Sequence, residues 1–215
     1  MEIRPASDRS LLVSFGDAIT LEEHREVRRL LCTFQERPRG ILNLHPAFAS
    51  VLIDFDPRRR THDEIAALVR DRVAVPPSQS ADDTRVMEIP VCYGGESGPD
   101  LASVAEHTGL TPEQVVDLHT SASYLVYFLG FSPGFPYLGG LPPQLATPRL
   151  PAPRKRVPAG SVAIGGNQTG IYPMESPGGW RIIGRTPVRL FDLEANPPAL
   201  LRAGDTVRFV PQRSS

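Results

Sequence analysis

A glycine- and proline-rich stretch between Phe131 and Pro187 constrains the fold of this chain more than any other feature. It holds 10 Gly and 11 Pro in 57 residues. Glycine admits positive φ angles and proline fixes φ at about −65°, so the mixture specifies particular turns. Aromatic and apolar residues recur between these turn-formers, which lets the segment bury a core, unlike a proline-rich linker. The stretch therefore predicts a rigid, shaped surface.

The second half of the chain reads as many short strands with two helices. Helices are expected over residues 101–107 and 111–119, where Thr111 is an N-cap and Pro112 occupies the first helical position. The expected strands are residues 85–91, 124–131, 161–164, 170–172, 180–184, 188–193 and 206–210. Short strands at regular spacing with Gly/Pro turns predict a closed barrel.

The first half has a different composition and predicts a separate domain. Residues 1–84 contain 2 Gly and 6 Pro, whereas residues 85–215 contain 16 Gly and 17 Pro. Two strand–strand–helix units follow one another, each helix opening with a capping box at Thr20 or Thr61. We therefore expect an α+β chain. A small α/β domain, ferredoxin-like in outline, spans residues 1–76, a polar linker residues 77–84, and the barrel residues 85–215.

Composition excludes several classes of function. The net charge of −1 gives no field that would recruit nucleic acid or a membrane surface. Lys155 is the only lysine, and no phosphate-binding Gly-x4-Gly-Lys-[Ser/Thr] surrounds it. The start of the chain lacks the apolar core of a signal peptide and no apolar run is long enough to span a membrane, which favours a cytoplasmic protein. Cys32 and Cys92 lack CxxC spacing and are expected to be buried small hydrophobes.

The histidines and Glu175 do not form a recognisable catalytic motif in the sequence. His119 could be a general base, but no Ser or Cys is paired with it in a known elbow motif, so a structural role is favoured. His24, His45 and His62 lack metal-ligand spacing; solvated or capping roles are expected, and no metal site is predicted. Glu175 has no second carboxylate close in sequence and is expected to cap a turn or pair with an arginine. No catalytic residue can be assigned.

Binding is the more promising reading of the glycine- and proline-rich stretch. Arg154, Lys155 and Arg156 are flanked by prolines, and could either bind an anion or form a solvated loop. The aromatic residues could be core plugs or anchors of a binding groove; they are Phe135, Tyr137, Tyr172 and Trp180. Residues 165–170 are glycine-rich, but lie between strands and predict a hairpin rather than a phosphate cradle.

Several motifs of this stretch resemble one known family. They are Gly130-Phe131-Ser132-Pro133-Gly134-Phe135-Pro136-Tyr137-Leu138, Val157-Pro158-Ala159-Gly160-Ser161-Val162, Gln168-Thr169-Gly170-Ile171-Tyr172-Pro173, Ser176-Pro177-Gly178-Gly179-Trp180, Ile183-Gly184-Arg185-Thr186-Pro187 and Ala203-Gly204-Asp205. With Pro148-Arg149 and Pro153-Arg154, they resemble the PxpB/KipI family, the allophanate hydrolase subunit 1-like proteins. The likeness runs over nearly the whole chain.

The resemblance implies a cyclophilin-like β-barrel after the small domain. It implies a subunit of an ATP-dependent 5-oxoprolinase that opens 5-oxo-L-proline to L-glutamate with PxpC-like and PxpA-like partners, and that is inactive alone. ATP would bind at a site shared with or supplied by a partner. The positions expected to face the partner or substrate are Phe135, Tyr137, Arg154, Gln168, Tyr172, Ser176 and Trp180. Prolyl isomerase activity is not expected, because the fold alone does not carry it.

Two alternatives remain open at the level of sequence. Like KipI, the chain could be a regulatory protein that binds and inhibits a sensor histidine kinase. It could also serve in an allophanate- or urea-type amide hydrolase or carboxyltransferase.

Overall fold

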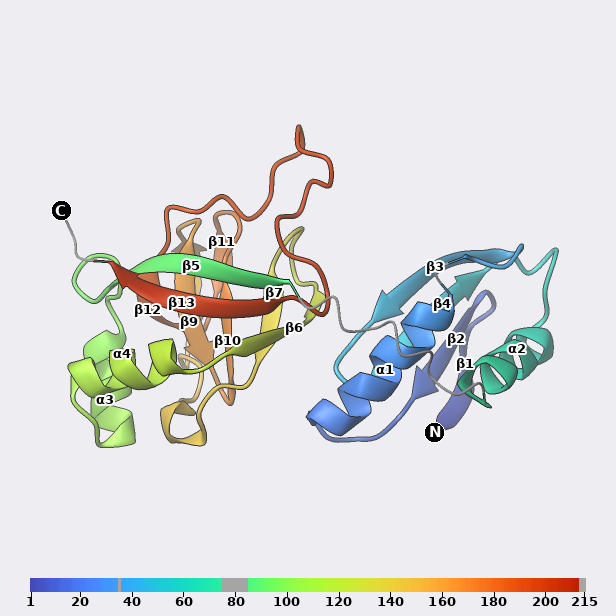
Figure 1. Cartoon of the computed structure of the whole chain (residues 1–215), viewed down its shortest axis with the longest axis horizontal. Coiled ribbons are helices and arrows are strands. Elements are labelled where there is room, and N and C mark those ends of the chain that lie inside the picture. The colour runs from blue at the N-terminus through green and yellow to red at the C-terminus, as the bar shows by residue number, and fades with distance from the viewer. Residues whose placement is uncertain (35, 75–84, 213–215) are drawn as a thin grey trace. The chain divides into compact units, whose positions relative to one another are not determined.

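The chain folds into two units with separate hydrophobic cores, Met1–Asp83 and Thr84–Ser215 (Figure 1). The computed structural model describes residues 1–34, 36–74 and 85–212. The predicted linker, residues 77–84, lies outside the described residues. None of the described helices is long and apolar enough to cross a membrane.

The first unit is a four-stranded antiparallel sheet with two helices. Its elements are β1 (Glu2–Ser7), β2 (Ser10–Ser14), α1 (Leu21–Thr33), β3 (Ile41–Pro46), β4 (Ser50–Phe55) and α2 (His62–Ala74). The strand order is β1-β2-β4-β3, and α1 and α2 contact each other and the sheet. The predicted capping box at Thr61 forms in full: the Glu64 backbone N–H donates to Thr61 Oγ1, and the Thr61 backbone N–H donates to Glu64 Oε2. At Thr20 only the first half forms: the Glu23 backbone N–H donates to Thr20 Oγ1, while the Glu23 carboxylate accepts from the Thr20 hydroxyl. The predicted strand–strand–helix repeat is confirmed.

The ferredoxin-like outline of this unit stays a prediction. A ferredoxin-like domain runs βαββαβ, whereas this unit runs ββαββα. The two successions differ only in the place of the first strand: if β1 came last in the chain, the unit would run βαββαβ. In the sheet, β1 occupies an edge beside β2.

Two residues of α1 differ from expectation, and the helical period explains both. His24 is fully buried rather than solvated, because it lies three residues before buried Val27 on the same face of the helix. Cys32 is exposed rather than buried, because it lies off the stripe formed by Val27, Leu30 and Phe34. The other two histidines of the unit are more exposed: His45 pairs with Asp54 at 3.0 Å, and His62 Nε2 lies 2.8 Å from the Ser7 carbonyl oxygen.

The second unit contains a closed barrel, as predicted. Its elements are β5 (Val86–Tyr93), α3 (Leu101–Thr108), α4 (Pro112–Ser121), β6 (Tyr124–Leu129), β7 (Pro136–Gly139), the 3-10 turn η1 (Pro143–Leu145), β8 (Arg154–Val157), β9 (Ser161–Gly165), β10 (Gln168–Ile171), β11 (Ser176–Gly178), β12 (Arg181–Arg185) and β13 (Thr206–Gln212). Seven of the described strands close in the order β10-β7-β6-β13-β5-β12-β9. Strands β8 and β11 form a separate pair, and α3 and α4 lie against β12 and β13 (Figure 1).

Two hydrophobic clusters lie on opposite faces of the β9–β10 hairpin. Val162, Ile164 and Ile171 belong to the larger cluster, which also includes residues of α3, α4 and β13. Ala163, between Val162 and Ile164, belongs to the second cluster, which contains Phe135, Val157, Tyr172, Trp180 and Ile182. Because side chains alternate along a strand, this wall of the barrel is buried on both faces. The second cluster holds most of the aromatic residues singled out from the sequence.

One expected strand is absent from the described structure, and three strands were not expected. Residues 188–193 form only an isolated bridge, Phe191 to Ala199, and Leu193 is 84% exposed. Leu190 of this segment is buried in the core, but the segment has no continuous strand partner among the described residues, and a strand needs one. Strands β7, β8 and β11 have only three or four residues each, too few for alternation to be recognised.

Candidate functional site

Four predicted site residues meet in one aromatic cluster on the second face of the barrel wall. The Phe135 ring centre lies 5.1 Å from that of Tyr137, 5.3 Å from Tyr172 and 5.6 Å from Trp180. All three contacts are edge-to-face, which is the favoured geometry of aromatic pairs. Phe131, which is 63% exposed and has a positive φ of 65°, extends the cluster, with its ring 5.4 Å from that of Phe135.

Glycines on the hairpin make room for this cluster. A Cβ at Gly165 would lie 2.5 Å from the Trp180 ring, and one at Gly170 would lie 3.0 Å from Phe135. Trp180 therefore lies directly on the backbone of the barrel wall. Phe135, Tyr172 and Trp180 are at most 5% exposed, so these three rings are packed inside the cluster. Tyr137 is half-buried, and its burial raises the pKa of its hydroxyl.

Two other predicted residues carry buried polar atoms without partners. Gln168 is 7% exposed, and its Nε2 has no hydrogen-bond partner among the described residues; the same is true of Ser176 Oγ. Gln168 lies two residues before Gly170, so both point to the face of the aromatic cluster. A buried polar group without a partner destabilises a fold by about 1–3 kcal/mol. Such groups are therefore candidates for contacts that the chain makes with something else.

The predicted site residue Arg154 forms a two-pronged ion pair within the chain. Its Nη1 and Nη2 donate to Asp100 Oδ2 and Oδ1 at 2.8 and 2.7 Å. The same carboxylate accepts the Ile182 backbone N–H at 2.7 Å. Asp100 is buried and precedes α3, so the pair ties β8 to α3 and β12. Any contact of Arg154 with another molecule would share the guanidinium with Asp100.

The other residues of this basic segment divide between pairing and exposure. Arg156 pairs with Glu175 at 2.6 Å, which confirms the expectation that Glu175 would pair with an arginine. Both side chains are largely exposed, at 78% and 49%. Lys155 is also exposed. Arg149 lies above the Trp180 ring, 5.7 Å from its centre, and adds a cation–π contact at the edge of the cluster.

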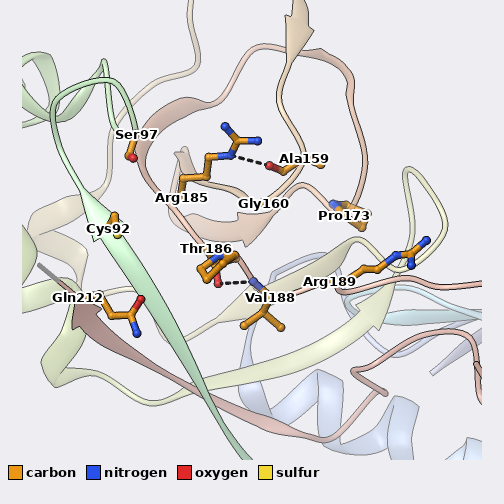
Figure 2. Close-up of a pocket in the computed structure, with 11 residues that line it drawn as sticks. Cys92, Ser97, Ala159, Gly160, Pro173, Arg185, Thr186, Val188, Arg189 and Gln212 are labelled. Carbon is orange, nitrogen blue, oxygen red and sulfur yellow. Dashed lines mark hydrogen bonds between the residues drawn. The ribbon is translucent and has the colours of Figure 1, made fainter. Parts of the chain in front are cut away.

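A pocket of about 630 Å³ opens on the barrel, and its lining includes none of the predicted site residues (Figure 2). It is lined by Cys92, Ser97, Ala159, Gly160, Pro173, Arg185, Thr186, Pro187, Val188, Arg189 and Gln212. No local sequence pattern marks these residues as a site, because they come from separate segments of the chain. The motif from Ile183 to Pro187 was the available signal, since it contains Arg185 and Thr186. The pocket also corrects the expectation for Cys92, which is partly exposed at its wall.

The candidate general base His119 is held in a structural network. His119 is fully buried between Tyr93, whose hydroxyl lies 2.8 Å from Nδ1, and Thr169, whose Oγ1 lies 3.0 Å from Nε2. Burial lowers the pKa of His119 to about 3, so it serves as a structural residue, as predicted. Within residues 1–34, 36–74 and 85–212, no group of three or more His, Cys, Asp or Glu side chains could hold a metal ion.

Comparison with known proteins identifies the family. Residues 1–201 match the family described as carboxyltransferase domain, subdomain C and D. The chain is 42% identical to the B subunit of 5-oxoprolinase from Bacillus subtilis, over 97% of this chain and 92% of that protein. It is 46% identical to the corresponding B subunit from Escherichia coli O157:H7, over 95% and 93%. It is also 26% identical to urea amidolyase of Saccharomyces cerevisiae, covering 97% of this chain and only 13% of that protein.

Solved structures agree with these sequence matches. The fold superposes on TTHA0988 with a TM-score of 0.85 and 40% identity, over 96% of this chain; this chain spans only 40% of that one. PH0987 from Pyrococcus horikoshii is 44% identical over 99% of this chain and 98% of its own, with a TM-score of 0.60. From its motifs, its barrel and these full-length matches, the chain belongs to the PxpB family of carboxyltransferase-domain proteins, the family of the 5-oxoprolinase B subunits.

Proposed function

We propose that this chain is one subunit of an ATP-dependent 5-oxoprolinase, which hydrolyses 5-oxo-L-proline to L-glutamate together with PxpC-like and PxpA-like subunits. The observation that carries the proposal is the identity of 41–46% to three 5-oxoprolinase B subunits, over at least 92% of their lengths. Such full-length likeness supports a shared role, because it extends over both units of the chain.

The chemistry of the described residues supports a role that needs partners. The fully buried His119 is held in a structural network, and the candidate residues present binding groups rather than a nucleophile with its base. Because the relatives are B subunits, they imply further subunits in their own complexes. ATP in this proposal is used by the complex, with its binding site shared with or supplied by a partner.

We infer that the face around Gln168 meets the substrate or a partner subunit. It comprises Phe135, Tyr137, Arg154, Gln168, Tyr172, Ser176 and Trp180. The unpartnered Gln168 Nε2 and Ser176 Oγ support this inference, because contacts across an interface would satisfy them. Phe131 adds an exposed aromatic side chain next to the cluster. In this arrangement Arg154 positions β8 through Asp100 and is not itself assigned a catalytic role.

Reconstitution with purified subunits tests the proposal. The chain would be mixed with PxpC-like and PxpA-like subunits, 5-oxo-L-proline and ATP, and glutamate formation measured. Glutamate should form only when all three proteins are present. Undiminished activity when this chain is omitted would sink the proposal.

A second candidate rests on the urea amidolyase relatives. They are 26% identical over 97% of this chain, although the matched part is only 13% of each of those proteins. The same reconstituted complex should therefore be supplied with allophanate or urea in place of 5-oxoproline. Turnover of these amides, without turnover of 5-oxoproline, would favour this candidate over the first.

A further inference from the structure

The pocket in Figure 2 is built on three adjacent barrel strands in register. Arg185 on β12 lies directly opposite Cys92 on β5, and Gln212 on β13 lies opposite Cys92 on its other side. Residues paired across neighbouring strands point to the same face of a sheet. The guanidinium, the thiol and the amide therefore stand in one row along the wall of the pocket.

A glycine turn holds the arginine of this row in place. Arg185 Nε donates to the Ala159 carbonyl oxygen at 2.9 Å. The next residue, Gly160, has a φ of 80°, and a Cβ there would lie 2.3 Å from the Thr186 carbonyl oxygen. Only glycine lets this turn approach β12 so closely. The turn thus fixes one edge of the guanidinium, while the terminal nitrogens of Arg185 have no hydrogen bond within the described part of the chain.

The charge of the pocket is positive and close to a single unit. Arg189 already pairs with Asp192 at 2.9 Å, whereas Arg185 has no acidic partner among the described residues. The residues that line the pocket include no Asp or Glu. Pro173, Pro187 and Val188 give the same pocket an apolar wall. One uncompensated guanidinium suits a monoanion better than a polyphosphate, which carries several charges.

We propose that this pocket binds a small organic carboxylate, with Arg185 holding the carboxylate and the prolines contacting its apolar part. If the chain is a 5-oxoprolinase subunit, which this step assumes, then 5-oxo-L-proline has the required chemistry: one carboxylate on a compact ring. The pocket shares no residue with the Gln168 face, so it is a second candidate binding surface.

Cys92 provides a reporter inside the pocket. In a Cys32→Ser chain it is the only thiol, and its rate of alkylation by iodoacetamide can be followed by mass spectrometry. 5-Oxo-L-proline should slow this alkylation, whereas 2-pyrrolidinone, the same ring without the carboxylate, should not. Arg185→Gln should raise the concentration needed for half-protection at least about tenfold, because the charge-assisted bonds are lost. Arg208→Gln is the matched control, since Arg208 also makes one exposed hydrogen bond but lies outside the pocket.

Several outcomes would overturn the proposal. They are protection by ATP or inorganic phosphate and not by the carboxylate, equal protection by 2-pyrrolidinone, and protection that survives Arg185→Gln. If Cys92 resists alkylation, amide NMR shifts of Gly160 and Thr186 on addition of 5-oxo-L-proline decide instead, and unchanged shifts refute the site. These measurements use the chain alone. If 5-oxo-L-proline binds but the reconstituted complex forms no glutamate, the binding site is supported and the proposed function is refuted. If the complex is active but the pocket does not bind 5-oxo-L-proline, the proposed function is supported and the binding site is refuted.

Discussion

At the residue scale, the network around His119 fixes the tautomer of a buried ring. The Thr169 hydroxyl donates to the Ala163 carbonyl oxygen at 3.0 Å, so it can only accept from His119 Nε2. The Nε2 atom therefore carries the proton, and Nδ1 accepts from the Tyr93 hydroxyl. The ring also stacks on Phe209, 4.5 Å between centres. A neutral histidine satisfies every polar atom in this chain of bonds, whereas a charged one would donate from Nδ1 to the Tyr93 oxygen and leave the Tyr93 hydroxyl proton without this acceptor.

The two buried histidines predict a loss of stability in mild acid. The folded-state pKa values of His119 and His24 are lowered to about 3 and about 4, mainly by burial, whereas an unfolded histidine titrates at about 6.5. Below pH 6.5 the unfolded chain therefore binds more protons than the folded chain. The free energy of unfolding should fall as the pH is lowered from about 6.5 towards 4. Between pH 7.5 and 4.5, the titration of His119 alone should lower the free energy of unfolding of the second unit by on the order of 3 kcal/mol. Urea unfolding followed by the fluorescence of Trp180, the only tryptophan, measures it.

The control for this prediction is His119→Gln, which removes the titrating ring. Its urea midpoint should depend less on pH over the same window, whatever its stability at pH 7.5. An equal pH dependence in both proteins would show that other groups, such as carboxylates, dominate.

The Gln168 side chain is expected to lower the stability of the isolated chain while supporting the activity of the complex. Replacing a buried amide that lacks a partner with leucine is expected to leave stability unchanged or to raise it by up to about 1 kcal/mol. If the amide contacts substrate or partner, Gln168→Leu should also lower glutamate formation at least tenfold, about 1.4 kcal/mol. The matched control is Thr169→Val, which should destabilise the chain by breaking the His119 network. A strongly destabilised Gln168→Leu variant would mean that the amide is structural.

At the element scale, local signals in the sequence predicted the helices and the longer strands. The N-cap at Thr20 and the capping box at Thr61 mark the starts of α1 and α2, and Thr111 with Gln114 forms a second capping box. These contacts span three residues, so sequence alone can reveal them. Strand β8 pairs with β11, which follows two further strands along the chain, through a shifted register. Such pairing depends on tertiary contacts that no local pattern contains.

The ion pair between Arg154 and Asp100 should contribute far more to the free energy of unfolding than the pair between Arg156 and Glu175. Arg154→Leu would leave the buried carboxylate of Asp100 without two charge-assisted bonds, at an expected cost of about 2–3 kcal/mol. Arg156→Leu removes an exposed pair with Glu175, which should cost less than about 1 kcal/mol. Urea midpoints of both variants, read from Trp180 fluorescence, test the contrast. Equal midpoints would refute the structural role assigned to Arg154.

At the scale of the whole molecule, the barrel was predictable but its pocket was not. Turn-forming residues between Phe131 and Pro187 indicated many short strands, and the aromatic residues among them do gather in one cluster. Most of that cluster is buried. A sequence cannot distinguish a buried aromatic cluster from a binding groove, because both require the same apolar residues. The pocket brings together Cys92, Arg185 and Gln212. These three residues become neighbours only through the pairing of β12, β5 and β13, which are far apart in sequence.

The separate cores of the two units predict that each folds without the other. The first core contains residues from Leu11 to Val69, and the larger core of the second contains residues from Ile89 to Phe209. Because neither core includes a residue of the other unit, a fragment of residues 85–215 should unfold cooperatively. Its Trp180 fluorescence should give a urea midpoint close to that of the full chain, while a fragment of residues 1–76 should keep its helical circular dichroism. A barrel fragment that is unfolded, or whose midpoint falls by more than about 1 M urea, equivalent to 1–3 kcal/mol, would show that the second unit needs the first.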